Sequence, residues 1–130
     1  MKREMRTMNK QEAFDKALFG IRAQGGWSFA GTCLYRSPNG RRCAIGHLLE
    51  DSEYMTKMEG KDVNVIFSLL PVRLQMLDES LAFLKNLQDV HDKFAITCDD
   101  EKEFLRLFEI GMRAFAEKEG LNYEAAAVRL

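Results

Sequence analysis

The chain has 130 residues, of which 46% are hydrophobic and 30% are charged, and it contains nine glycines and two prolines. This composition excludes collagen, a disordered tail and a disulfide-rich scaffold, and it is typical of one compact domain. A folded domain of this length buries roughly two-thirds of the surface of its unfolded chain, so its core needs neither a metal nor a disulfide. Residues 1–10 are charged where a signal peptide would be apolar, and no apolar run approaches the roughly 20 residues that cross a bilayer. We therefore expect a cytoplasmic protein without a membrane partner.

Charge is distributed unevenly along the chain. Residues 1–47 hold nine Lys and Arg against three Asp and Glu, a net charge of +6, whereas residues 48–130 hold ten against seventeen, a net charge of −7. Such an asymmetry can steer the basic half toward an acidic partner. Alternatively, the two halves neutralise each other within the fold.

Apolar residues at helical spacing predict three long helices, over residues 10–24, residues 78 or 80 to 94, and residues 99 or 100 to 119. The first begins with a capping box formed by Asn9 and Glu12, and Gly25 ends it because glycine readily takes the left-handed conformation. Gly120 ends the third helix in the same way. The third helix directs toward the core a stripe that consists of Phe104, Leu105, Phe108, Met112, Phe115 and Ala116.

Shorter elements are predicted between and after these helices. Residues 63–70 lie between a potential cap, Asp62, and a proline, which indicates a short helix despite their β-forming composition. Residues 51–61 are predicted to form an irregular polar connection, and residues 123–129 a terminal helical turn. The chain has neither a fixed repeat nor a linker, so all elements belong to a single domain, residues 1–130.

A β-hairpin is predicted over about residues 33–44. Residues 33–36 and 41–44 flank the turn sequence of residues 37–40, in which a proline is followed by residues that tolerate positive φ. Two isolated strands are marginally stable in water, so the hairpin is expected to lie against the helices. Residues 43–50 could instead turn directly into a helix, where Gly46 would let another backbone approach closely. The predicted fold class is mainly α with one small β-hairpin (α+β), in a single compact helical domain.

One segment carries the pattern Cys33-x-Tyr35-Arg36-x-Pro38-x-Gly40-x-x-Cys43-Ala44-Ile45-Gly46-x-Leu48-Leu49, which continues with Tyr54, Glu59-Gly60 and Leu87-Gln88-x-x-His91-Asp92. This pattern resembles a family of small uncharacterised proteins of bacteriophage and bacterial genomes, and it covers most of the chain. The chain departs from that family at Glu50, where members often have a proline before an acidic residue. The resemblance implies a phage or prophage accessory protein without an assigned reaction, ligand or fold. Small phage proteins of this kind commonly bind and block host macromolecules.

Three arginines, Arg36, Arg41 and Arg42, surround the tip of the predicted hairpin, with Tyr35 nearby. Arginines beside an aromatic residue are common both in protein–protein hot spots and in nucleic-acid contacts. The leading interpretation is a noncatalytic accessory protein that binds through these residues to an acidic surface of a host protein and inhibits it, in the host cytoplasm. A nuclease or a defence protein would be such a partner. The alternative is a small nucleic-acid-binding protein that uses the same arginines, although the acidic second half would repel phosphate.

Cys33, Cys43 and His47 form the metal-like set of the sequence. Cys43 and His47 are four residues apart and would share one face of a helix, and Cys33 could reach them across the hairpin, with His91 or Cys98 as a fourth ligand. Structural zinc sites usually contain paired short cysteine spacings, so we expect no cofactor and keep zinc as the alternative.

The same groups offer a third interpretation, a zinc-stabilised or thiol-dependent enzyme in which His47 activates Cys43, although no residue is identified that would orient the histidine. An odd number of cysteines in a chain without an export signal indicates reduced thiols. We expect both Cys33 and Cys43 to be small buried apolar groups. His91 is expected to be a core histidine that is hydrogen-bonded to a backbone carbonyl.

Overall fold

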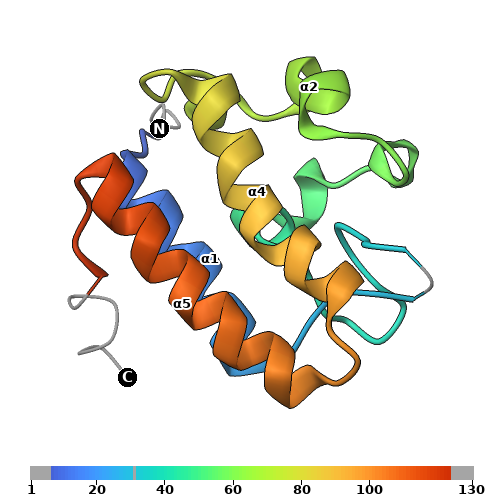
Figure 1. Cartoon of the computed structure of the whole chain (residues 1–130). Coiled ribbons are helices and arrows are strands. Elements are labelled where there is room, and N and C mark those ends of the chain that lie inside the picture. Colours follow the sequence, from blue (N-terminus) through green and yellow to red (C-terminus); the bar gives the residue numbers. More distant parts are fainter. Residues whose placement is uncertain (1–6, 31, 124–130) are drawn as a thin grey trace.

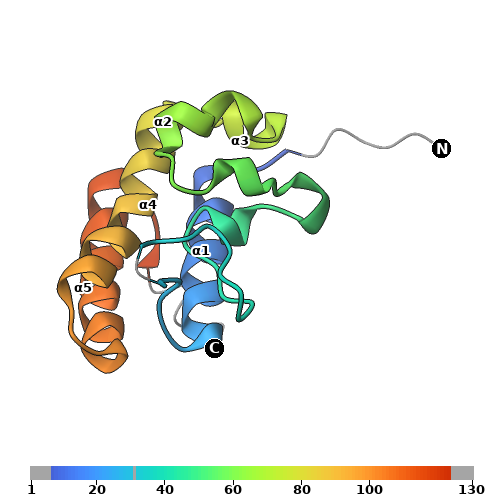
Figure 2. The same ribbon diagram turned by 90° about the vertical axis from the view of Figure 1, so that its right-hand side faces the viewer.

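The computed structural model describes residues 7–30 and 32–123. Three long helices, α1 (Lys10–Gln24), α4 (Ser80–Thr97) and α5 (Glu101–Glu119), pack together (Figure 1). The connection from α1 to α4 contains the 3-10 turns η1 (Gly46–Leu48), η2 (Asp51–Glu53), η3 (Thr56–Met58) and η4 (Phe67–Leu69) and the short helices α2 (Val63–Ile66) and α3 (Val72–Gln75). Seen from the side, α4 and α5 form one flank of the molecule, and α2 and α3 lie across its top end (Figure 2).

The long helices confirm most of the boundaries that the sequence indicates. Asn9 and Glu12 form the predicted capping box of α1, and Gly25 ends the helix with φ +82°. The side chain of Asp100 caps α5, and Gly120 ends it with φ +73°. Helix α4 continues to Thr97, three residues beyond its predicted end.

The shorter predicted elements are confirmed only in part. Residues 63–69 are helical, as α2 and η4, but the side chain of Asp62 makes no capping hydrogen bond. The connection over residues 51–61 contains two 3-10 turns, and residues 43–50 contain a third. The predicted terminal turn lies, apart from Tyr123, outside the described residues.

The predicted β-hairpin over residues 33–44 is wrong, because none of the described residues belongs to a strand. Two isolated antiparallel bridges occur instead, between Phe29 and Cys33 and between Arg36 and Arg42. The predicted turn is present: Gly40 has φ +89°, and its N–H donates to the carbonyl of Ser37 at 2.9 Å. The fold class is therefore mainly α, in one helical domain.

The hairpin is limited to one bridge, which two backbone hydrogen bonds define: the N–H of Ser37 donates to the carbonyl of Arg41 at 2.9 Å, and the N–H of Cys43 to the carbonyl of Tyr35 at 3.4 Å. The carboxylate of Glu59 accepts the N–H groups of Tyr35 and Arg36, at 2.9 and 3.0 Å. On the opposite arm, Gln24 accepts the N–H of Arg42 at 2.9 Å and donates to its carbonyl at 2.8 Å. The N–H of Tyr35 and the carbonyl of Cys43 would extend the ladder by one more bond, but the first donates to Glu59 and the second accepts the N–H of His47 at 3.0 Å.

Aromatic rings join the three long helices. Phe14 of α1 and Phe83 of α4 both pack on Phe115 of α5, with ring centroids 6.1 and 5.5 Å apart. Burying a large apolar side chain contributes roughly 1.5–3 kcal/mol, so these rings are a main source of stability. Gly111 lets α4 and α5 approach closely, because a Cβ there would lie 2.9 Å from the side chains of Phe94 and Val90.

The uneven charge distribution is largely neutralised inside the molecule. Of the six Lys and Arg in residues 7–47, five form ion pairs with carboxylates of the second half: Lys10–Glu119, Arg22–Glu109, Arg36–Asp51, Arg41–Glu101 and Arg42–Asp51. The basic half is therefore not a free basic face. Over the described parts of the chain, no helix combines the length and the apolar character needed to cross a bilayer.

Candidate functional site

Two of the predicted partner-binding residues, Tyr35 and Arg41, are engaged in the interior. Tyr35 is 6% exposed, and its hydroxyl donates to the carbonyl of Lys61 at 2.6 Å. The guanidinium of Arg41 lies 2.7 and 2.8 Å from the two carboxylate oxygens of Glu101, at the start of α5. These two side chains hold the segment of residues 27–46 to the rest of the fold.

The other two, Arg36 and Arg42, converge on one exposed carboxylate. Their Nη2 atoms lie 2.8 and 3.2 Å from the same oxygen, Oδ1 of Asp51, whose side chain is 84% exposed. The guanidinium of Arg36 also lies over the ring of Tyr54, 5.0 Å from its centroid. Because two cations share one anion, this group, called here the Arg36–Arg42 pair, keeps one positive charge in excess.

The metal-like set of the sequence does not come together. Cys43 is fully buried, and burial is the main reason that its thiol pKa is raised. His47 lies 2.9 Å from the amide oxygen of Gln24, and burial together with the charge of Arg42 lowers its pKa to about 4. Among the described residues, the three ligating groups that do lie within 4.8 Å of one another are those of Cys33, His91 and Asp92.

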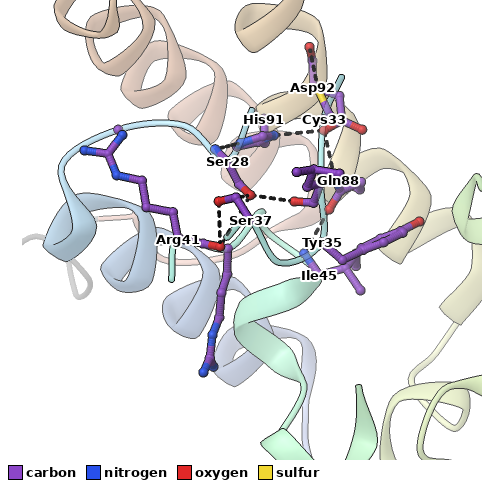
Figure 3. Close-up of polar contacts among 12 residues, drawn as sticks. Ser28, Cys33, Tyr35, Ser37, Arg41, Ile45, Gln88, His91 and Asp92 are labelled. Atoms are coloured by element: carbon purple, nitrogen blue, oxygen red, sulfur yellow. Dashed lines mark hydrogen bonds and ion pairs between the residues drawn. The ribbon is translucent and has the colours of Figure 1, made fainter. Parts of the chain in front are cut away.

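The hydrogen bonds of His91 decide what this second set can do (Figure 3). The ring is fully buried, and its Nε2 accepts the backbone N–H of Ser28 at 3.0 Å. The proton of the neutral ring must then lie on Nδ1, where it is donated to Oδ1 of Asp92 at 2.8 Å. A metal on Nδ1 would shift that proton to Nε2, directly against the N–H of Ser28. The geometry therefore opposes a metal ion on His91.

His91 is a core histidine, as expected, but its backbone partner is an N–H group rather than the predicted carbonyl. The same bond opposes thiol catalysis, because no ring nitrogen is left to accept a proton from Cys33. Burial, with a contribution from the charge of Asp92, raises the pKa of Cys33 to about 12, which disfavours the thiolate.

Contacts between loop and helix account for much of the pattern that resembles phage proteins. Gln88 accepts the N–H of Ile45 at 2.9 Å and donates to Asp92 at 2.8 Å, so it joins α4 to the loop (Figure 3). Gly46 admits the backbone closely, as predicted, because a Cβ there would overlap the carbonyl oxygen of Tyr35. The pattern thus marks the way in which this loop is attached.

A groove lies beside this network, between residues 32–35, residues 60–63 and the exposed side of α4. Its volume is about 530 Å³. Asp92 and Cys33 are among its lining residues, together with the aromatic residues Phe29 and Tyr35.

Sequence reasoning assigned no role to the polar residues that organise this region: Glu59, Gln88 and Asp92 entered only as members of the family-like pattern, and Ser28 did not enter at all. One signal was present, since Gln88 and Asp92 occur three residues before and one residue after His91 and so share one side of a helix. Nothing local indicates the bonds made by Ser28 and Glu59, because their partners lie 63 and 24 residues away.

In comparisons with known proteins, no protein-family model, no curated protein and no solved structure matches the chain. The resemblance to phage proteins accordingly remains a prediction from the sequence pattern.

Proposed function

We propose that the protein is a noncatalytic binding protein that uses the Arg36–Arg42 pair to hold an acidic surface of a partner protein. The observation that carries this proposal is the shared oxygen of Asp51, which leaves two guanidinium groups with one exposed counterion. A carboxylate of the partner can therefore pair with the guanidinium charge that Asp51 alone does not neutralise. Guanidinium groups bind carboxylates well because their planar donors match both carboxylate oxygens.

The backbone around the pair favours binding because it is already fixed. Glu59 holds the N–H of Arg36, and Gln24 holds both the N–H and the carbonyl of Arg42. The side chains of Arg36 and Arg42 are also only 20% and 32% exposed, which limits their freedom. Groups held in place before binding lose less conformational entropy when the complex forms.

An acidic protein fits this site better than a nucleic acid does. Affinity for a nucleic acid grows with the number of phosphates that are neutralised. Most cations of residues 7–47 are already paired with internal carboxylates, so one excess charge offers little to a phosphate backbone. The resemblance of the sequence to phage proteins adds the expectation that the partner is a host nuclease or defence protein and that binding inhibits it.

The test is affinity capture with the full chain from a bacterial lysate, with and without nuclease treatment, followed by binding measurements on the captured protein. Arg42→Glu should abolish capture, whereas Asp51→Asn, which removes the internal competitor, should raise the affinity by a few fold. Two variants on the exposed side of α5, Lys102→Glu and Glu117→Gln, make the same charge changes elsewhere and should behave like the wild type.

Opposite effects at Arg42 and Asp51 distinguish this site from a general effect of net charge. Equal capture by Arg42→Glu and wild type would rule out the Arg36–Arg42 pair as the interface. Loss of the captured material on nuclease treatment, with a steep salt dependence, would favour a nucleic-acid partner instead.

A further inference from the structure

The groove described above is a second candidate binding site, independent of the Arg36–Arg42 pair. Its volume of about 530 Å³ falls within the range of roughly 300–1,000 Å³ that is usual for small-molecule sites. Its lining residues include two aromatic residues, Phe29 and Tyr35, and Asp92 on α4. Aromatic residues and a carboxylate thus line the same space.

The carboxylate of Asp92 is held in one orientation. Its Oδ1 accepts two hydrogen bonds, from Nδ1 of His91 and from Nε2 of Gln88, both at 2.8 Å. Apart from the weak thiol donor of Cys33, which lies beside this carboxylate, no described residue donates to its Oδ2, and the side chain is 30% exposed. One carboxylate oxygen is therefore positioned by the fold and still free to accept a donor from a ligand.

The charges that line the groove favour a positively charged ligand. Three carboxylates, those of Asp62, Asp89 and Asp92, face two ammonium groups, those of Lys61 and Lys85. The ammonium of Lys61 is directed elsewhere, because it donates to the carbonyl of Lys57 at 2.7 Å. Within the described residues, neither Asp62 nor Asp89 forms an ion pair, so their charge is not compensated locally.

The carboxylates of the groove also shift the pKa of two neighbouring groups. Burial is the largest cause of the raised pKa of both Cys33 and Tyr35, and the charge of Asp92 raises both further. The same negative charge would stabilise a cation, and an aromatic ring that lines the groove can add cation–π attraction.

We propose that this groove binds an organic cation, in which an ammonium, amidinium or guanidinium group donates to Oδ2 of Asp92 and an apolar body lies along Phe29 and Tyr35. The cation is either a free small molecule or a basic side chain of a peptide. Both sources present the same chemistry to Asp92.

The test is an NMR titration of the full-length, ¹⁵N-labelled chain with benzamidinium chloride, and with neutral benzamide as the matched probe. The backbone amides of Cys33, Gln88 and Asp92 report on the groove, and the amide of Lys118 at the far end of α5 is the reference. Benzamidinium should cause saturable shifts at the groove amides with a dissociation constant in the millimolar range or below, and benzamide should bind at least about tenfold more weakly.

Three variants separate the groove from other carboxylates. Asp92→Asn should weaken benzamidinium binding about tenfold, because a charge-assisted hydrogen bond becomes a neutral one. Ile96→Lys places a positive charge at the rim, on a side chain that is 66% exposed, and should weaken binding without affecting the fold. Glu117→Gln, which removes a carboxylate on α5, should bind like the wild type. If Asp92→Asn does not fold, Ile96→Lys still tests the groove.

The proposal is overturned if benzamide binds as well as benzamidinium, if neither Asp92→Asn nor Ile96→Lys weakens binding, or if the groove amides do not shift. A further titration distinguishes the two sources. Stronger binding of N-acetyl-arginine-N-methylamide than of 2-phenylethylammonium would identify a peptide side chain, and the reverse order would identify a free amine. Absence of binding by all three cations would overturn the proposal.

Discussion

Replacement of Glu59 tests the explanation for the missing hairpin. The carboxylate of Glu59 accepts three hydrogen bonds, from the N–H groups of Tyr35 and Arg36 at 2.9 and 3.0 Å and from the hydroxyl of Tyr54 at 2.7 Å. Glu59→Ala removes the acceptor of all three while leaving their donors in place. Glu59→Gln keeps one oxygen and turns an NH₂ group toward at least one donor.

The expected cost follows from the number of donors that lose a partner. A hydrogen bond to a charged acceptor contributes roughly 1.5–3 kcal/mol net, and an exposed donor recovers part of that from water. The two backbone donors are half-buried and the hydroxyl of Tyr54 is more accessible, so Glu59→Ala should lower the free energy of unfolding by about 2–4 kcal/mol. Glu59→Gln, which loses one bond, should lower it by about 1–2 kcal/mol.

Urea unfolding followed by circular dichroism at 222 nm measures both changes, with Glu117→Ala on α5 as a control that should stay within about 0.5 kcal/mol of the wild type. Backbone amide exchange at Tyr35 and Arg36 should become faster in Glu59→Ala than in the control. A loss below about 0.5 kcal/mol in Glu59→Ala, with unchanged exchange at these amides, would show that Glu59 does not hold the segment.

Four further outcomes are expected. Glu79 has φ +50°, a left-handed conformation that strains the backbone of any residue except glycine. Glu79→Gly should therefore raise the free energy of unfolding, measured with urea, by up to about 1 kcal/mol, and a decrease would show that the backbone is not strained there. Gly46→Ala should lower it by more than about 2 kcal/mol, because the added Cβ overlaps the carbonyl of Tyr35, and a neutral effect would mean that the loop yields easily. Burial lowers the pKa of His47 to about 4, so the stability linked to its neutral form is complete above the unfolded pKa of about 6.5 and is lost as the pH falls from there to about 4. His47→Gln should lack this part of the pH dependence when the free energy of unfolding is measured with urea. Because the N–H of Ser28 opposes a metal on His91, a chelator should leave the melting temperature unchanged, and one equivalent of bound zinc with chelator-induced unfolding would contradict this.

Elements specified by neighbouring residues were predictable from the sequence. The boundaries of α1 follow from Asn9, Glu12 and Gly25, all of which act within one turn of the helix ends. The buried stripe of α5 follows from its period, and it holds for Phe104, Phe108, Met112, Phe115 and Ala116, whereas Leu105 is only partly buried. Sequence patterns therefore predict an element correctly where the hydrogen-bond and packing partners that determine it are close in the sequence.

The segment of residues 27–46 was not predictable in the same way, because its partners are remote. A turn sequence and β-forming flanks indicate a hairpin, but the ladder ends after one bridge, because Glu59 binds the N–H of Tyr35 and His47 binds the carbonyl of Cys43. The arginines that the sequence analysis assigned to a partner are paired with Asp51 and Glu101, the latter 60 residues from Arg41. No sequence spacing shows that such a carboxylate will be near.

The bond between Ser28 and His91 has a consequence for synthesis of the chain. These residues are 63 positions apart, and ribosomes add roughly 5–20 residues per second, so Ser28 waits about 3–13 s for its partner. During that time nothing on α4 can anchor the segment of residues 27–46, although α1 is complete and carries its own caps. Cys43, fully buried in the finished fold, is accessible to an oxidant or an electrophile from its own synthesis until this segment is anchored on α4. We therefore expect the thiol of Cys43 to react in the nascent chain and to become protected once α4 has been synthesised and packed.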